Sequence, residues 1–179
     1  MIFKSAILKV LTICFFVAFG SSCISDNVSE FYADWKAKND SYLTNMKDSS
    51  GYVLYNIPAS RGGSSFYYKI TSPGDESGTS PLTTDYVTVN YRGKLITNYI
   101  FDETYTGNNP ASDTTATPFT FYASGLIRGW TENLIQMKAG EVRRIVIPYE
   151  LGYGTMGYGS ILPYSTLVFD IQLKSFGPR

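Results

Sequence analysis

Two stretches of the chain alternate apolar and polar residues with the two-residue period of a β-strand. Residues 85–95 read DYVTVNYRGKL, and residues 166–176 read TLVFDIQLKSF. Because successive side chains of a strand point to opposite faces, this alternation predicts strands with one face in the core. The residues predicted to face the core are Val87, Val89 and Tyr91 in the first stretch and Leu167, Phe169, Ile171 and Leu173 in the second.

Three shorter apolar segments and one helical pattern complete this part of the chain. Residues 66–72 (FYYKITS), 118–123 (PFTFYA) and 141–148 (EVRRIVIP) are rich in the aromatic and branched residues that strands favour. Residues 131–137 (TENLIQM) have the pattern of a helix. Since several antiparallel strands and one short helix cannot form a bundle, we predict an α+β fold, an antiparallel curved β-sheet wrapped around one short α-helix. We place this domain at residues 65–179.

Upstream of the predicted sheet, residues 29–46 (SEFYADWKAKNDSYLTNM) have the pattern of an amphipathic helix. Phe31, Trp35, Tyr42 and Met46 recur near the helical period, with charged residues between them. The segment KDSSG that follows ends the helix. Two interpretations of this N-terminal helical extension are open: a spacer helix that packs on the domain, which we favour, or a helix that binds a partner.

Residues 1–22 have the layout of a signal peptide. Two lysines give a basic start, the segment ILKVLTICFFVAFG is apolar, and small residues stand directly before Cys23. A cysteine in this position resembles a bacterial lipoprotein cleavage site, although Gly20 stands where such sites usually have an aliphatic residue. We therefore predict lipidation of Cys23 and a lipid-anchored linker over residues 23–64. The alternative is a plain signal peptide that leaves Cys23 as a free thiol.

Composition excludes several kinds of chemistry. The chain has no histidine and only two cysteines, so neither a Ser-His-Asp or Cys-His catalytic site nor the common zinc ligand sets can be assembled, and we expect no metal and no cofactor. Removal of the leader, which contains Lys4 and Lys9, leaves 13 of the 15 basic residues, against 15 acidic residues. This balance lacks the excess of positive charge that is typical of nucleic-acid-binding proteins. The 16% of aromatic residues suits sheets and pockets.

Six segments in order between residues 85 and 176 resemble the motifs of one known family, the FKBP-type peptidyl-prolyl cis/trans isomerases. They are VTVNYRGKL, IFD, PFTF, GLIRGWTENLIQMKAGE, IPYELGYG and ILPYSTLVFDIQL. Each segment alone is a weak signal, but six in the family's order make the resemblance specific. It implies an FKBP-like fold, in which the binding pocket lies between the curved sheet and the short helix.

The resemblance also implies which residues form the pocket. Trp130 of IRGW would be its floor, under the proline ring of a substrate, although a lone tryptophan at a helix start is usually part of a core. Tyr153 would offer its hydroxyl, and Ile127 its backbone N–H, to substrate carbonyls. The implied walls are Tyr91, Phe101, Phe119, Leu126, Ile127 and Phe169, and the implied residues of an overhanging loop are Tyr158 and Leu162.

Asp102 occupies the acidic position of the family's pocket, where it would accept a hydrogen bond from a ligand or orient a tyrosine. The alternative is a surface aspartate in a turn. A basic partner for this aspartate is frequent in the family, whereas the long polar segment 103–118 has none, so macrolide binding does not follow from the resemblance. For Phe121 and Ile171 we predict core positions, because only one face of each strand can line a pocket.

Together these features predict a peptidyl-prolyl cis/trans isomerase that assists the folding of exported proteins through an apolar pocket, without metal or nucleophile. The expected partners are proline-containing unfolded or nascent exported proteins and, through the lipid anchor, a membrane. We expect a monomer in the bacterial cell envelope, as an outer-membrane lipoprotein that faces the periplasm or the cell surface. The alternative functions on the same fold are a non-catalytic holdase and an envelope lipoprotein that binds another component.

Overall fold

The computed structural model of the protein describes residues 22–178, which form a seven-stranded antiparallel sheet and two α-helices. Across the sheet the order is β1-β2-β6-β7-β3-β4, and β5 pairs with the same edge of β3 as β4 does. The strands are β1 (Val53–Asn56), β2 (Ser65–Ser72), β3 (Tyr86–Leu95), β4 (Ile100–Glu103), β5 (Phe119–Tyr122), β6 (Val142–Ile147) and β7 (Leu167–Gly177).

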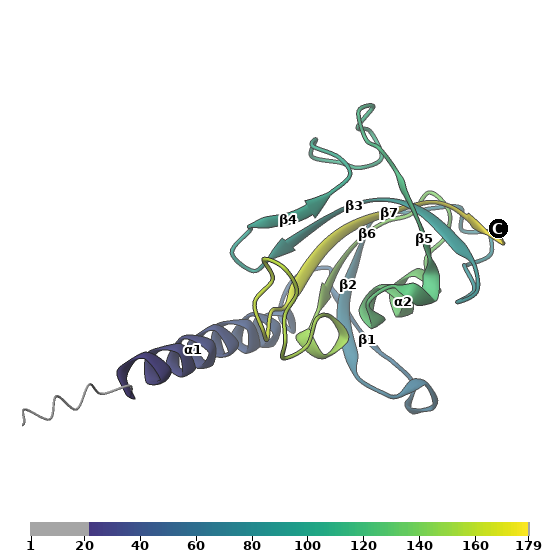
Figure 1. The fold of residues 1–179 in the computed structure, drawn as a ribbon. Helices are drawn as coiled ribbons and strands as arrows, with labels where there is room; N and C mark the ends of the chain where they lie inside the picture. Colours follow the sequence, from purple (N-terminus) through teal and green to yellow (C-terminus); the bar gives the residue numbers. More distant parts are fainter. Residues whose placement is uncertain (1–21, 179) are drawn as a thin grey trace, which may run out of the picture.

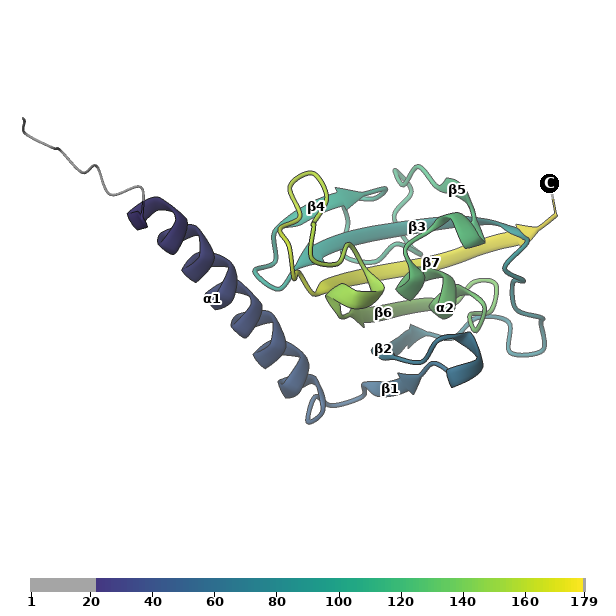
Figure 2. The ribbon, with the colours of Figure 1, turned by 60° about the horizontal axis from the view of Figure 1, so that its bottom comes forward.

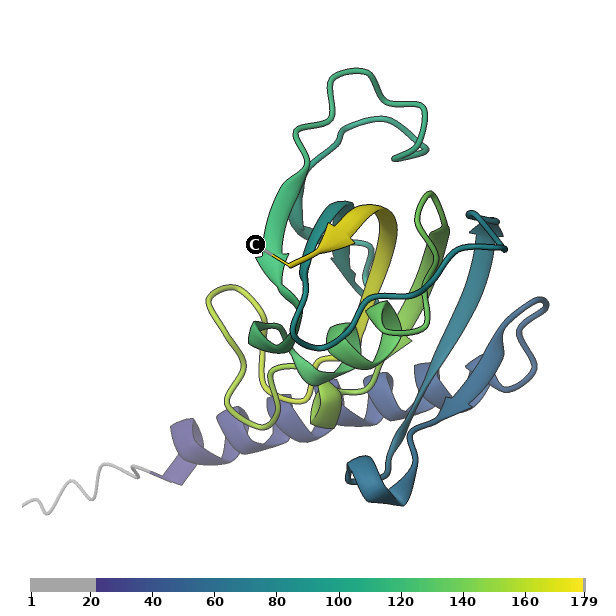
Figure 3. The same cartoon turned by 90° about the vertical axis from the view of Figure 1, so that its right-hand side faces the viewer.

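The sheet curves around the short helix α2 (Arg128–Leu134), as Figure 1 and Figure 3 show. This arrangement confirms the predicted α+β fold. In the described part of the chain the connections contain three short 3-10 helices, η1 (Ala59–Arg61), η2 (Ala123–Gly125) and η3 (Tyr149–Leu151).

The two strands with clear alternation, β3 and β7, lie side by side near the middle of the sheet. They pair from Tyr86 with Gly177 to Leu95 with Leu167. All seven of the residues predicted to face the core belong to the core cluster that contains Trp130 and Leu134 of α2, which confirms the face assigned to each strand: Val87, Val89, Tyr91, Leu167, Phe169, Ile171 and Leu173.

The sequences of two strands, β1 and β4, show no alternation of apolar and polar residues. Each has four residues, lies at one end of the sheet order and keeps most of its side chains exposed, so its sequence carries no apolar periodicity. Pairing forms them instead: β1 pairs with β2, and β4 pairs with β3 around a bulge between Gly93 and Lys94. The sheet therefore begins at Val53, upstream of residue 65, the predicted start of the domain.

Helix α2 begins three residues earlier than the pattern at 131–137 predicts. The carbonyl of Ile127 accepts hydrogen bonds from the N–H groups of Trp130 and Thr131, at 2.9 and 3.2 Å, and so opens the helix before Arg128. Trp130 consequently lies in the first turn. Gly129 lets this turn approach β6, because a Cβ at residue 129 would lie 2.5 Å from Cγ2 of Ile147.

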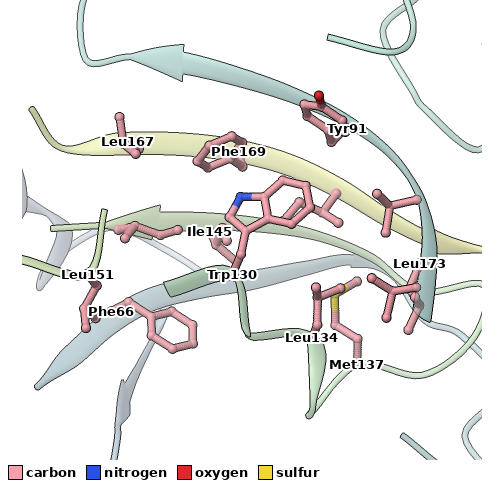
Figure 4. Close-up of a cluster of buried hydrophobic side chains, with 14 of the residues drawn as sticks. Phe66, Tyr91, Trp130, Leu134, Met137, Ile145, Leu151, Leu167, Phe169 and Leu173 are labelled. Atoms are coloured by element: carbon pink, nitrogen blue, oxygen red, sulfur yellow. The ribbon is translucent and has the colours of Figure 1, made fainter. Parts of the chain in front are cut away.

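The core lies between α2 and the face of the sheet that curves around it. Figure 4 shows Leu134 and Met137 pointing from the α2 region toward Leu173, while Phe66 and Ile145 come from the strands on the other side of Trp130. These side chains are each at most 1% exposed, except Trp130 at 4%. Trp130 therefore lies between these two groups of core side chains, where it also contacts Tyr91 and Phe169.

The N-terminal helix α1 (Ser22–Met46) ends at the predicted residue and begins seven residues earlier. It packs on the domain through two hydrogen bonds to the segment before β7. The indole Nε1 of Trp35 donates to Ser165 Oγ at 3.1 Å, and the N–H of Thr166 donates to Oδ1 of the fully buried Asn39 at 2.7 Å. Figure 2 shows the N-terminal end of α1 projecting away from the sheet.

Within residues 22–178, no helix combines the length and the apolar character needed to cross a membrane. Nearly all of the predicted signal peptide, residues 1–21, and the side chain of Cys23 lie outside the described residues.

Candidate active site

A hollow of about 330 Å³ lies over Trp130, between the first turn of α2, strands β3 and β7 and the segment that leads from β6 to β7. Most of its lining is aromatic or aliphatic, and its polar side chains are one carboxylate, one serine and the hydroxyls of three tyrosines. The lining residues are Tyr91, Phe101, Asp102, Phe121, Leu126, Ile127, Trp130, Tyr153, Tyr158, Gly159, Ser160, Ile161 and Phe169.

The indole of Trp130 forms the floor of this cavity. Two neighbouring rings meet it nearly at right angles: Tyr91 from β3 at a centroid distance of 5.2 Å, and Phe169 from β7 also at 5.2 Å. Figure 4 shows both rings above the indole. Edge-to-face contacts of this kind favour one orientation of each ring, so the floor has a fixed shape.

One wall of the cavity depends on the glycine at residue 93 in β3, which has no side chain. Phe101 from β4 packs edge-to-face on Phe169, at 5.5 Å between ring centroids. Both rings lie over Gly93, where a Cβ would come within 2.5 Å of Phe101 Cε2 and 2.6 Å of Phe169 Cε1. Glycine at residue 93 is therefore required for the wall, because a larger residue would displace one of the two rings.

The acidic group of the cavity is joined to a tyrosine. The hydroxyl of Tyr91 donates a hydrogen bond to Asp102 Oδ2 at 2.5 Å across the β3–β4 pair. Burial raises the pKa of Tyr91, and the neighbouring carboxylate of Asp102 raises it further, so this hydroxyl stays protonated well above neutral pH. The carboxylate of Asp102 is therefore joined to a tyrosine hydroxyl, while its predicted role toward a ligand stays a prediction.

Two of the hydrogen-bond donors at the cavity are those that the sequence motifs implied for substrate carbonyls. Neither the hydroxyl of Tyr153 nor the backbone N–H of Ile127 has a hydrogen-bond acceptor within residues 22–178. Burial is the main cause that raises the pKa of Tyr153, with smaller contributions from Tyr158 and Asp102, so its hydroxyl also stays a donor at neutral pH. The ring of Tyr158 stacks on Tyr153 at 5.2 Å and stands at the mouth.

The cavity brings together most of the residues that the sequence motifs implied. Nine of them line it: Tyr91, Phe101, Asp102, Leu126, Ile127, Trp130, Tyr153, Tyr158 and Phe169. Two of them do not, Phe119 and Leu162. Phe119 lies on the same face of β5 as Phe121 but two residues farther out along the strand, and Leu162 follows the residue, Ile161, whose side chain reaches the cavity.

Four lining residues were not assigned to the pocket: Phe121, Gly159, Ser160 and Ile161. Phe121 packs against the core, as predicted, but its ring, 6.1 Å from Trp130, also lines the cavity. The two-residue period of PFTF gives a signal for it, since it shares a face with Phe119. Ile171, by contrast, is fully buried in the core, as predicted.

No cluster of His, Cys, Asp or Glu side chains suited to a metal ion occurs in the described part of the chain. The groups that the cavity offers to a ligand are apolar rings and uncharged donors, beside one carboxylate that already accepts from Tyr91. Such a site can exclude water from a small apolar group and hold the carbonyls next to it.

Comparisons with known proteins identify a family model and relatives that match this chain. The family model described as FKBP-type peptidyl-prolyl cis-trans isomerase matches residues 78–174. The protein named FKBP-type peptidyl-prolyl cis-trans isomerase FkpA, from Escherichia coli strain K12, is 37% identical over 146 residues, which are 82% of this chain and 48% of that protein. Outer membrane protein MIP of Legionella longbeachae is 38% identical over 141 residues, 78% of this chain and 53% of that protein.

A solved structure shows the same likeness. The crystal structure of FkpA from Escherichia coli aligns with a TM-score of 0.69 at 34% sequence identity, covering 86% of this chain and 64% of that chain. The present chain thus spans about half the length of the sequence relatives that it matches.

Proposed function

Because the chain belongs to the family of FKBP-type peptidyl-prolyl cis-trans isomerases, as its six sequence segments predict, we propose that the cavity over Trp130 catalyses rotation about peptide bonds that precede proline. Rotation breaks no bond, and its barrier of roughly 18 to 20 kcal/mol is the conjugation lost when the C–N bond twists. Neither a nucleophile nor a metal is needed.

The aromatic lining supplies the main catalytic effect. A planar amide is a strong dipole that water solvates well, whereas the twisted amide has less charge separation. Transfer from water into a cavity of Tyr91, Phe101 and Phe169 therefore raises the energy of the planar form more than that of the twisted form. A difference of about 5 to 7 kcal/mol would accelerate rotation by four to five orders of magnitude.

The two available donors position the substrate while its imide bond turns. The N–H of Ile127 and the hydroxyl of Tyr153 would hold carbonyls on either part of the substrate, so that the remainder rotates about a fixed point. Asp102 acts through Tyr91: its hydrogen bond fixes the tyrosine ring that closes one wall over Trp130. Asp102 is thus a positioning residue.

The observation that carries this proposal is the hollow over the Trp130 indole, with three aromatic neighbours around it and unused donors at its edge. A tryptophan that only filled the core would be covered by side chains on every face. The volume of about 330 Å³ is of the size that small-ligand sites have in proteins.

Turnover of a proline tetrapeptide by the purified chain tests the proposal. We expect catalysed cis-to-trans conversion in a protease-coupled assay, and a loss of at least about tenfold in kcat/KM for Phe169→Ala relative to the unchanged chain. Urea unfolding of the variant shows whether it remains folded at the assay temperature. Suppression of protein aggregation without any peptide turnover would instead support the holdase alternative.

We also propose that the protein acts in the cell envelope, anchored through a lipidated Cys23, on proline-containing proteins that fold after export. The leader pattern before Cys23 supports export, and the name of the Legionella longbeachae relative, an outer membrane protein, supports an envelope location. Slow isomerisation before proline can limit the folding of such clients. The N-terminal part of α1, which projects away from the sheet, would then hold the domain away from the membrane.

Mass spectrometry of the membrane fraction tests the anchor. We expect an acylated N-terminal Cys23 there, and release of the protein into the soluble fraction after Cys23→Ser. A soluble chain that retains an unacylated Cys23 would contradict the anchor and leave the catalytic proposal unaffected.

A further inference from the structure

The connection between β1 and β2, residues 57–64, lies beside α2, as Figure 2 shows. It is outside residues 78–174, which the family model matches. Backbone hydrogen bonds close it into a compact turn, because the carbonyl of Pro58 accepts from the N–H groups of Arg61 and Gly63 at 2.9 and 3.2 Å. This connection, the hairpin tip, therefore holds its other carbonyls in fixed directions.

Arg128, the first residue of α2, joins the helix to the hairpin tip. Its Nη2 donates to two backbone carbonyls of the tip, that of Arg61 at 2.5 Å and that of Gly63 at 2.8 Å. The guanidinium has room there because Gly62 lies between the two acceptors, and a Cβ at residue 62 would lie 3.0 Å from the same Nη2. Hydrogen bonds from a charged donor are stronger than those between neutral groups, so this contact fixes the start of α2 relative to β1 and β2.

A second contact joins the same two elements one helical turn farther along α2. The side chain of Arg61 forms an ion pair with Glu132, with 3.1 Å between Nη2 and Oε2, and donates to the Tyr55 hydroxyl at 2.7 Å. The Glu132 side chain is only 9% exposed, so water screens this pair less than it screens a surface pair. The helix and the hairpin tip are thus held together by one arginine from each.

The turn that Arg128 holds carries two groups that the proposed catalysis requires, the N–H of Ile127 and the indole of Trp130. Helix α2 has only seven residues, and the side chain of its N-cap residue, Ile127, is apolar and cannot accept from the first N–H groups. Because helices of this length are marginal by themselves, tertiary contacts set their position. The bonds of Arg128 are contacts of this kind, made by the residue directly after Ile127.

We propose that Arg128 is a positioning residue of the isomerase, because its bonds to the hairpin tip hold the turn that presents Ile127 and Trp130 to the substrate. Arg128 does not line the cavity, so it acts through these two residues and not by contact with the peptide. The hairpin tip, which precedes the predicted start of the domain at residue 65, then belongs to the catalytic unit. This inference rests on the proposed isomerase function of the cavity.

The first test removes the charged donor. In Arg128→Leu we expect kcat for a proline tetrapeptide to fall about fivefold to tenfold while KM stays within about twofold, because a displaced turn binds the peptide but holds its carbonyl poorly during rotation. Arg128→Lys keeps a charged donor and should recover most of kcat. Urea unfolding shows whether each variant is folded at the assay temperature.

Lys138→Leu is the matched control for loss of a clamp. The Nζ of Lys138 also donates to a loop carbonyl, that of Gly78 at 2.7 Å, but Lys138 follows the C-terminal end of α2 and does not line the cavity. This variant should leave kcat and KM unchanged. Equal values of kcat in Arg128→Leu and Lys138→Leu would overturn the inference, since Arg128 would then have no role beyond that of an ordinary structural contact.

A pair of glycine variants tests the contact with the arginine still present. Gly62→Ala and Gly63→Ala both place a side chain at positive φ in the hairpin tip, at +89° and +63°. The Cβ at residue 62 would press on the Arg128 guanidinium, whereas no atom lies within 4 Å of the Cβ at residue 63. We therefore expect kcat to fall several-fold in Gly62→Ala and clearly less in Gly63→Ala. The same kcat in both would contradict the proposed role of the contact.

The position of the turn can also be measured without turnover. The indole N–H signal of Trp130 in NMR spectra reports it, because the rings of Tyr91 and Phe169 meet the indole at 5.2 Å each. The signal should shift in Arg128→Leu and stay in place in Lys138→Leu. If the unchanged chain turned over no peptide, the isomerase proposal would fail, while this shift would still support positioning of the turn by Arg128. An unshifted signal in Arg128→Leu would overturn it.

Discussion

Trp130 at the floor of the cavity is 4% exposed, whereas Tyr158 at its mouth is 70% exposed, although both line the same hollow. The floor is held by side-chain packing: rings from β3, β5 and β7 surround the indole. The mouth is held by backbone turns, with positive φ at Gly154, Gly157 and Gly159.

This difference separates two properties of the site. The floor is part of the core, so its shape is as stable as the fold, and changes there affect stability and catalysis together. Tyr158 at the mouth lies outside the core, so its removal should affect mainly the binding of substrate. Four substitutions test this contrast, and they are given from the most to the least damaging for stability.

Removal of the floor should have the largest effect. Trp130→Ala takes a large buried ring out of the core, and we expect the free energy of unfolding to fall by about 3 to 5 kcal/mol, together with the loss of measurable peptide turnover. Urea unfolding and the peptide assay measure the two quantities. Retention of full stability in Trp130→Ala would show that the indole is not part of the core.

A methyl group at Gly93 should damage the wall. Gly93→Ala places a Cβ against Phe101 and Phe169, and we expect a loss of about 1 to 3 kcal/mol in the free energy of unfolding, with a clear decrease in kcat/KM. Gly177→Ala is the control, because no atom lies within 4 Å of its added Cβ and it should be close to neutral. Equal effects of the two substitutions would rule out the close approach at residue 93.

Loss of the Tyr91 hydroxyl should have a smaller effect, with a defined pH dependence. Tyr91→Phe removes the hydrogen bond to Asp102, which we expect to cost about 1 kcal/mol at pH 7. Since the pKa of Tyr91 is raised in the fold above its ordinary value of 10.0, the folded state keeps this proton longer than the unfolded state, and stability falls as pH rises above about 10.

The variant should therefore lose less stability between pH 10 and pH 11 than the unchanged chain does. Urea unfolding at a series of alkaline pH values measures this. An equal decrease in the free energy of unfolding between pH 10 and pH 11 in both proteins would mean that the fold does not raise the pKa of Tyr91.

A change at the mouth should have the least effect on stability. Tyr158→Ala removes an exposed ring that stacks on Tyr153, and we expect the free energy of unfolding to stay within about 0.5 kcal/mol of the original. The KM for a proline peptide should rise a few-fold while kcat changes less, because the ring stands at the mouth of the proposed binding cavity, where it would cover a bound peptide. A loss of stability comparable to that of Gly93→Ala would remove the distinction between floor and rim.

The same contrast explains how much could be predicted from the sequence. Alternation identified β3 and β7 and the faces of Tyr91 and Phe169, because their apolar side chains face the core in a regular period. The short edge strands β1 and β4 escaped prediction, since their exposed side chains leave no period and only pairing with distant strands forms them.

At the rim, the sequence could not fix which side chains turn inward. The motif comparison assigned Leu162 to the cavity, but Ile161 lines it. The loop has this register because the N–H of Tyr158 and the N–H of Ile161 each donate to the other residue's carbonyl at 2.8 Å, and because a Cβ at Gly157 would collide with the carbonyl of Ile161. Such backbone contacts leave no apolar pattern. The docking of α1 through the buried Asn39 is equally hidden, since a polar residue in a helix normally predicts exposure.

The proposed catalysis depends on an apolar lining that lowers the barrier to rotation by excluding water from the planar amide. The most direct test is kcat/KM for a proline tetrapeptide in Phe101→Leu and Phe101→Gln, two side chains of similar size at a partly exposed wall position. Phe101→Leu should stay within about threefold of the original, whereas Phe101→Gln, which brings water into the cavity, should lose at least about tenfold. Equal losses of kcat/KM in the two variants, both of them folded, would show that exclusion of water from the cavity is not what lowers the barrier.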